Sequence, residues 1–503
     1  MSQPTAGEAS SSNFDSLELP SMTPGSLARK FGPGMMLMMT GIGTSHLVTA
    51  PVAGGRYGYA LLWCLPIAYI FKYYGFEMAI RFTHATGRSM LDAYATAWKK
   101  IPVWYVLVTT IIQSAVGQAG RLIAAAAVVF YFFRLYLGVD IPGFDDDKEL
   151  AVYAFLLGIM SVAIILRGRY VVVEIATKIA AGILIVCTFA VYAVQPAPIA
   201  EFVHFFQLET PEGSWLIIAS FLGLLPTGID VSLQASEWGK AKKVGMGRLR
   251  SEMEAQGLVA KFDAFDGRKE DLTVDISKLP EHAQEYCRRW FRIGLLDFRF
   301  GYIISFVLAT IFLVLAAVWL FPSEVSGNAV MGEIARIFTD SVGPNLMLVF
   351  LAGALAATYS TAFNYFDGWP RVVGACCRNL FRKTAELPRK PGEELDSPQR
   401  KTWYSEYNIY RASMFFSLFA SVAIIAGIPR PVYLVLVASA LAYFVAPVIF
   451  FLNLYYCRTI IRKDDALFYP STFATWFGWL SLIVFTGMSA ILILQRLFGI
   501  SPF

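Results

Sequence analysis

The sequence predicts an all-α integral membrane protein with eleven transmembrane helices in two related halves. Its 503 residues are 56% hydrophobic and only 16% charged, which is too apolar for a water-soluble protein of this size. Apolar stretches of about 20 residues, the length that crosses a bilayer, recur along the whole chain. Two of these stretches are interrupted by glycine or proline at corresponding places in the two halves.

The eleven spans follow from the apolar stretches in chain order. We place them at residues 35–54, 58–80, 102–136, 150–167, 171–194, 214–238, 295–321, 342–365, 408–428, 431–456 and 472–497. The third span is long enough to hold a strong tilt or an extramembrane turn.

The first and sixth spans carry the interruptions. The first reads Gly41-Ile42-Gly43-Thr44-Ser45-His46, and the sixth reads Gly223-Leu224-Leu225-Pro226-Thr227-Gly228. A helix broken inside a bilayer exposes backbone groups that lipid cannot satisfy, so such breaks line a cavity or bind something. Paired breaks indicate the substrate site of a secondary transporter. We therefore expect the substrate to contact Gly43, Thr44, Ser45, His46, Leu225, Pro226, Thr227 and Gly228.

Orientation follows from the basic residues, which accumulate in cytoplasmic loops. The loops after the second, fourth and tenth spans are the basic ones, with Arg88, Lys99, Lys100, Arg167, Arg169, Arg458, Arg462 and Lys463. The N-terminus is therefore expected inside and the C-terminus outside, in a multi-pass protein of a bacterial inner membrane. These loops also account for the net charge of +5, so no nucleic-acid partner is needed.

The spans divide the chain into five parts. We expect a disordered cytoplasmic N-terminus at 1–30, the first repeat with span six at 31–238, and a cytoplasmic insertion at 239–293. Spans seven to ten follow at 294–457 with a cytoplasmic loop at 378–406, and a loop and span eleven occupy 458–503. The six cysteines have no zinc-site spacing, and no cofactor is expected. We expect the protein to be a monomer embedded in the lipid bilayer.

Ionisable residues inside spans are costly and usually functional. His46 lies within the first interruption, where an imidazole could take up protons for coupling. Arg121 in the third span either serves substrate or coupling, or pairs with Asp230. Glu237, Asp297 and Asp367 lie at inner span ends and suit gating salt bridges or interface anchoring. Lys72, Glu77 and Arg81 in the second span are expected to form one internal pair and one anchor.

Several motifs resemble the Nramp family of proton-coupled divalent-metal transporters. Gly32-Pro33-Gly34 leads into the first span, which ends in Ala53-Gly54-Gly55-Arg56-Tyr57-Gly58-Tyr59. The likeness continues in His84-Ala85-Thr86-Gly87-Arg88-Ser89, in the break at Pro226 and in Tyr359-Ser360-Thr361. It covers about residues 30–500 apart from the cytoplasmic insertions.

The resemblance also implies where the family's metal ligands would stand. The Asp-Pro-Gly-Asn motif of the family falls on Gly43, Thr44, Ser45 and His46, its Met on Leu225, and its Gln near Ser439. The proton-pathway acids of the third span fall near Gln118 and Arg121. A dehydrated divalent cation needs oxygen, nitrogen or sulfur ligands, preferably charged. The sequence therefore predicts a divergent member whose substrate is not a classical transition metal.

The resemblance implies a LeuT-type fold: a five-plus-five inverted repeat with one extra span, working by alternating access. Half-helix N-termini, with His46 and Arg121, suit a small anionic or zwitterionic solute, and protons or sodium are the candidate coupling ions. One alternative is a proton-coupled divalent-metal transporter with a non-standard site. Another is a membrane receptor or channel. An enzyme is not expected, because neither His-x-x-x-His nor Gly-x-Ser-x-Gly occurs.

Overall fold

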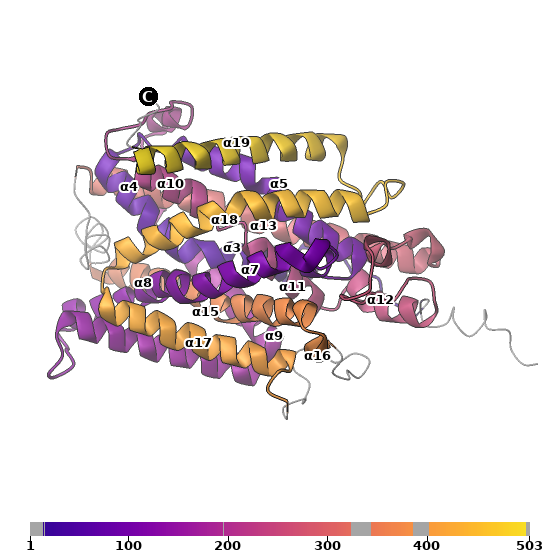
Figure 1. Cartoon of the computed structure of the whole chain (residues 1–503). Coiled ribbons are helices and arrows are strands. Elements are labelled where there is room, and N and C mark those ends of the chain that lie inside the picture. The colour runs from indigo at the N-terminus through magenta and orange to yellow at the C-terminus, as the bar shows by residue number, and fades with distance from the viewer. Residues whose placement is uncertain (1–13, 15, 195, 323–343, 386–401, 499–503) are drawn as a thin grey trace, which may run out of the picture.

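The computed structural model describes residue 14 and residues 16–194, 196–322, 344–385 and 402–498. Throughout these ranges the regular structure is helical and no strand occurs. Most of the long helices run side by side along a common direction (Figure 1). Helix α12 and the segments near it lie at one end of this bundle, and α4 lies at the other (Figure 1).

The first half of the chain contains the helices of the predicted spans one to five. They are α2 (Pro24–Lys30), α3 (Pro33–Gly41), η1 (Ile42–Thr49), α4 (Ala50–Tyr57), α5 (Cys64–Thr86), α6 (Met90–Tyr94), η2 (Trp98–Lys100), α7 (Ile101–Ile112), η3 (Gln113–Gly117), α8 (Gln118–Phe130), η4 (Tyr131–Tyr136), α9 (Asp146–Val194) and η5 (Ile199–Phe205). The predicted third span is thus a nearly continuous assembly from α7 to η4.

The second half contains the predicted insertion and the later spans. Its helices are α10 (Trp215–Leu224), α11 (Val231–Ala241), α12 (Met246–Ala255), η6 (Lys269–Leu272), η7 (Ile276–Lys278), α13 (Glu281–Trp319), α15 (Pro344–Leu380), α16 (Arg382–Ala385), α17 (Glu406–Gly427), α18 (Pro431–Ile460) and α19 (Thr472–Phe498). Helix α19 ends at the end of the bundle away from α12 (Figure 1).

Within the described residues, seven helical stretches are long and apolar enough to cross a membrane by length and composition. They include two separate stretches of α9, Asp146–Arg167 and Val171–Val194, which match the predicted fourth and fifth spans. Four of the eleven predicted spans are absent from this set: spans one, two, six and eight. Spans one and six are divided into short helices, and α5 carries the charged residues Lys72, Glu77 and Arg81.

The two interruptions differ in form. Between α10 and α11 the chain leaves the helix, with Leu225 in an extended conformation and a cis peptide bond before Pro226. The first interruption is not unwound: η1 is a π-helix that joins α3 to α4 without a gap. A neighbouring hydroxyl explains the difference, because Thr361 accepts a hydrogen bond from the Gly43 N–H (2.8 Å). A side chain of α15 therefore satisfies a backbone N–H group of η1 that would otherwise have no hydrogen-bond partner.

The N-terminal segment is more ordered than expected where the structure describes it. Residues 24–30 form α2, and Phe14 and Leu17 are buried in an apolar cluster with Met246, Leu249 and Met253 of α12. The expectation of disorder does not hold for these residues, because the insertion offers them an apolar surface that their own sequence does not reveal. This cluster is separate from the main core between the spans.

Candidate functional site

The two interrupted spans meet at Gly41 and Pro226. A Cβ added at Gly41 would lie only 1.7 Å from the Pro226 carbonyl oxygen, and one added at Gly43 would lie 2.4 Å from the Ala357 carbonyl oxygen. Hence α3 and η1 press directly against the break of the sixth span on one side and against α15 on another. Thr361 strengthens the second contact, because its hydroxyl also lies 2.8 Å from the Met39 carbonyl oxygen.

His46 is fully buried in a network of neutral partners. Its Nε2 lies 2.9 Å from the Ser305 carbonyl oxygen and 3.0 Å from the Tyr69 hydroxyl, and its Nδ1 lies 2.8 Å from the Ser45 hydroxyl. Because a carbonyl can only accept, the contact with Ser305 assigns a proton to Nε2. Both ring nitrogens are thus engaged by α13, α5 and η1, which is the geometry of a satisfied core histidine.

Arg121 occupies a different place, beside the break of the sixth span. It is 2% exposed, and its guanidinium carbon lies 3.9 Å from the ring centre of Tyr365 and 4.9 Å from that of Trp369. The guanidinium donates to the Gly117 carbonyl (2.6 Å) and to the Tyr365 hydroxyl (3.0 Å). The Tyr365 hydroxyl in turn lies 3.2 Å from that of Thr227. The side chain therefore connects α8, α15 and the break.

Arg121 does not form an ion pair with Asp230 in the part of the chain that the structure describes. Asp230 instead accepts a long hydrogen bond from Trp369 Nε1 (3.5 Å). Both hydrogen-bond partners of Arg121 are neutral oxygens. The buried guanidinium therefore has no carboxylate among its direct hydrogen-bond or ion-pair partners in the described residues, although Asp230 lies close enough to interact with it electrostatically.

Buried side-chain amides without hydrogen-bond partners also occur in this part of the protein, and that of Gln113 lies beside Arg121. A Cβ added at Gly117 would come within 2.5 Å of Gln113 Oε1, 2.8 Å of the Trp369 ring and 2.9 Å of Arg121 Nη1, so these three side chains converge there. Several buried polar atoms have no hydrogen-bond partner among the described residues: both amide atoms of Gln113 and of Gln234, Oε1 of Gln118 and Nε of Arg121. Buried polar groups are normally paired, so this cluster has the capacity to bind a polar solute.

Other predicted binding residues have structural partners. Gln118 Nε2 donates to the Ala362 carbonyl (3.0 Å), and Ser439 donates to the Val435 carbonyl of its own helix (2.6 Å). The Leu225 and Thr227 carbonyls accept hydrogen bonds from Lys72. Pro226 and Gly228 lie in the same break, and the structure does not describe the Thr44 side chain.

Three acids expected at the inner ends of the spans have separate roles. Asp297 accepts from the backbone N–H groups of Gly32, Gly34 and Met35 at 2.8–3.0 Å and so caps the start of α3. Asp367 is held by Trp238 (2.8 Å), Tyr410 (2.6 Å) and Arg371 (2.7 Å). Glu237 lies 3.9 Å from Arg378. Only Asp367 and Glu237 therefore take part in ion pairs.

Arg378 of α15 is the centre of a charged network that joins four helices. It contacts Asp92 of α6 (2.9 Å) and Glu406 of α17 (2.7 Å), besides Glu237 of α11. Burial by itself raises the pKa of Asp92, but the positive charges of Lys240, Arg378 and Arg88 together lower it well below its usual range. This carboxylate is therefore charged at neutral pH and holds the network together.

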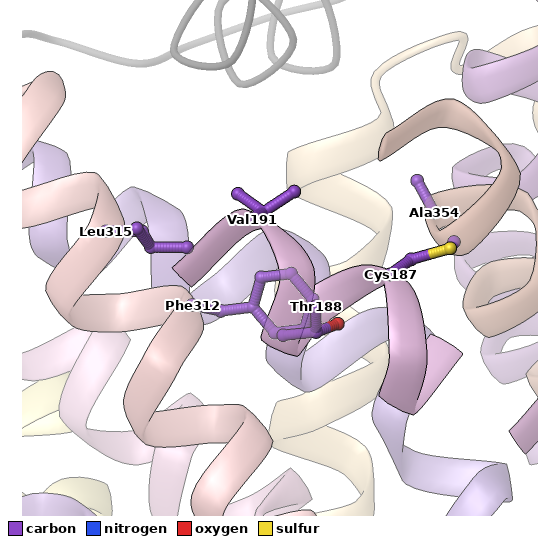
Figure 2. Close-up of a pocket in the computed structure, with 7 residues that line it drawn as sticks. Cys187, Thr188, Val191, Phe312, Leu315 and Ala354 are labelled. Atoms are coloured by element: carbon purple, nitrogen blue, oxygen red, sulfur yellow. The ribbon is translucent and has the colours of Figure 1, made fainter. Parts of the chain in front are cut away.

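Cavities elsewhere are poorer candidates for a site. A cavity of about 10 Å³, lined by Cys187, Thr188, Val191, Phe312, Leu315, Gly353 and Ala354, lies where α9, α13 and α15 meet (Figure 2). It has room for about one water molecule. A larger open groove of about 440 Å³ lies beside Arg88, Asp92 and Arg378, outside the spans.

Comparison with known proteins then identifies the family. The model of the Nramp family, described as natural resistance-associated macrophage protein-like, matches residues 34–495. This chain belongs to the Nramp family. An uncharacterised protein of Pasteurella multocida (strain Pm70), PM0681, is 20% identical over 368 residues, which cover 71% of this chain and 72% of that protein.

Solved structures agree on the fold. A mutant of the Eremococcus coleocola manganese transporter aligns with a TM-score of 0.62 at 11% identity, covering 97% of this chain and 92% of that one. The nucleobase-cation-symport-1 family transporter Mhp1 in a closed conformation aligns with a TM-score of 0.53 at 13% identity, covering 93% and 87%. The chain is thus an all-α membrane protein with the LeuT-type transporter fold, and the family implies a small solute or ion as substrate.

In the described ranges, no three His, Cys, Asp or Glu side chains come together in a group that could hold a metal ion. Sequence reasoning missed Tyr365, Trp369 and Gln113, which lie beside Arg121. Each is an ordinary residue of an apolar helix by composition, and only the packing of η3, α8 and α15 brings them together with Arg121.

Proposed function

We propose that this Nramp-family protein is an ion-coupled secondary transporter of a small anionic or zwitterionic solute. It works by alternating access in a bacterial inner membrane, with its N-terminus in the cytoplasm. Spans one, two, six and seven rock against a scaffold of spans three, four, eight and nine. Protons and sodium are the candidate coupling ions.

The observation that carries the substrate class is the buried guanidinium of Arg121. It lies against the break of the sixth span, faces two aromatic rings, and has neutral oxygens as hydrogen-bond partners. A buried charge without a directly bonded counter-ion is expensive, and a carboxylate is the natural bidentate partner of a guanidinium. The unpartnered amide of Gln113 adds a donor and an acceptor beside Arg121.

A divalent cation fits this region less well. The same positive charge that attracts a carboxylate repels a metal ion, and Leu225 stands where the resemblance implies the family's thioether ligand. The manganese transporter among the structural neighbours keeps metal transport as the competing reading. Loss of the Arg121 charge should weaken transport of an anionic solute, whereas it should not weaken transport of a divalent cation.

The test is uptake by the purified protein in proteoliposomes under an imposed proton or sodium gradient. Labelled carboxylates and amino acids are compared with manganese. We expect saturable uptake of a carboxylate-bearing solute, and Arg121→Gln should weaken its apparent affinity at least about tenfold, which corresponds to about 1.4 kcal/mol. Arg299→Gln is the matched control, because Arg299 is exposed and its guanidinium donates to the Tyr73 hydroxyl (3.0 Å).

Two results would contradict this function. One is saturable manganese transport with no carboxylate uptake. The other is full carboxylate uptake by a folded Arg121→Gln variant. Gradient-independent conductance in the same vesicles would instead favour a channel.

A further inference from the structure

The break of the sixth span contains a second buried positive charge, Lys72, in an unusual setting. Helix α10 ends at Leu224, and the chain is extended at Leu225. The last carbonyls of any helix lack partners within the helix and carry the negative end of its dipole. Inside a bilayer no water is available to satisfy them. Something else must therefore occupy this end of α10.

Lys72 fills that place from the neighbouring span. It lies on α5 and is 0% exposed. Its ammonium donates to the carbonyl oxygens of Gly223 (2.7 Å), Leu225 (2.8 Å) and Thr227 (3.2 Å). An ammonium has three N–H donors, and all three are accounted for by these oxygens.

The local charges show that Lys72 is not half of an ordinary salt bridge. No carboxylate lies within ion-pair distance of it among the described residues. Glu77 on the same helix is paired with Arg81 instead (Nε–Oε1, 2.9 Å). The Asp230 carboxylate folds toward Gly228, where an added Cβ would lie 2.2 Å from its Oδ1. Lys72 is thus bound by backbone dipoles, as a free cation would be.

Converging carbonyls at the end of a half-helix form the kind of cage that coordinates cations in transporters with broken helices. We propose that the Gly223, Leu225 and Thr227 carbonyls form a monovalent-cation site that the Lys72 ammonium occupies permanently. The break is then stabilised by a tethered charge and requires no dissolved ion at this position. Emptying the cage should create a site for a small primary ammonium ion.

The test is chemical rescue of Lys72→Ala, which removes Cγ, Cδ, Cε and Nζ. The probe is n-propylammonium, which replaces those four atoms. Isosteric n-propanol lacks the charge, and tetramethylammonium lacks the N–H donors. We expect Lys72→Ala to lose thermal stability, and n-propylammonium to restore the melting temperature in a saturable manner by about 3–5 °C. Neither control compound should do so.

Lys178→Ala is the matched variant. Lys178 has a carboxylate partner in Glu174 (2.7 Å) and is partly exposed, so its loss should not create a site for n-propylammonium. If Lys72→Ala cannot be purified, the yield of monodisperse protein extracted with n-propylammonium or n-propanol gives the same comparison. The proposal is overturned if the two compounds act equally, or if Lys72→Met melts at the wild-type temperature.

Discussion

The contact between Gly41 and Pro226 gives the most demanding prediction, because it joins the two interrupted spans. The conformation of Gly41 is right-handed, with φ −96° and ψ −35°, so a side chain would cause no backbone strain. Its effect would be purely steric. An alanine Cβ would lie 1.7 Å from the Pro226 carbonyl oxygen, whereas such contacts essentially never fall below 3.0 Å.

Relieving this overlap requires a displacement of about 1.3 Å, the difference between 3.0 and 1.7 Å. The obstacle is backbone, which cannot rotate away as a side chain would. Overpacking a close-packed interior costs about 1–3 kcal/mol, and separating two spans at the proposed site should also impair transport. We therefore expect Gly41→Ala to melt lower than wild type and to lose most of its uptake activity.

The assay is thermal unfolding of the purified variants together with uptake in proteoliposomes. Gly182→Ala is the control, because an added Cβ at Gly182 in α9 meets nothing within 4 Å. Alanine in an exposed helix interior should leave the protein unchanged or stabilise it by up to about 1 kcal/mol. Wild-type stability and uptake of Gly41→Ala would refute the reasoning that the two spans touch.

Three further changes test other contacts. Thr361→Val should lower the free energy of unfolding by about 1–3 kcal/mol, because it leaves the Gly43 N–H unsatisfied. The control is Thr358→Val, which loses only a hydrogen bond within its own helix. Thermal unfolding should show a smaller loss of stability for this control. Asp297→Ala should destabilise the protein by about 1–2 kcal/mol through loss of the α3 cap, and unchanged melting would contradict that role. The lowered pKa of Asp92 means that its stabilising effect is complete above the pKa of about 3.9 of an unfolded aspartate and declines as the pH falls below it. Asp92→Asn should therefore lower stability at pH 7 and flatten the acid limb of the stability curve, and an identical acid limb would refute the assignment.

The spans could be predicted because the length of an apolar run is read directly from the sequence. The helix ends could not. Helix α13 begins at Glu281, well before the apolar run, because its first turns belong to the insertion and pack against apolar residues distant in the sequence. Hydropathy identifies the part of a helix that lies in the bilayer. It does not show how far the same helix extends beyond the bilayer, where it packs against other parts of the protein.

The sequence also indicates local features of the candidate site, but not the partners that other helices bring to it. Glycine and proline correctly indicated a break at Pro226. The same reasoning expected an unwound first span, whereas Thr361 from a distant helix supports a π-helix there. His46 was weighed as a proton acceptor, but its partner Ser305 lies on α13. Spacing along one helix cannot reveal partners that another helix supplies.

The charges inside the bundle bear on the proposed anionic substrate. Lys72 and Arg121 both lie beside the break of the sixth span, and neither has a carboxylate partner among the described residues. Asp230 is the acid in the break that interacts electrostatically with both, and it accepts a hydrogen bond from the Trp369 indole. One carboxylate cannot neutralise two cations, so this region carries an excess positive charge. In a low-dielectric interior that excess favours binding of an anionic group over a dication. Since Lys72 is held by backbone carbonyls, Arg121 is the cation that remains available to a solute.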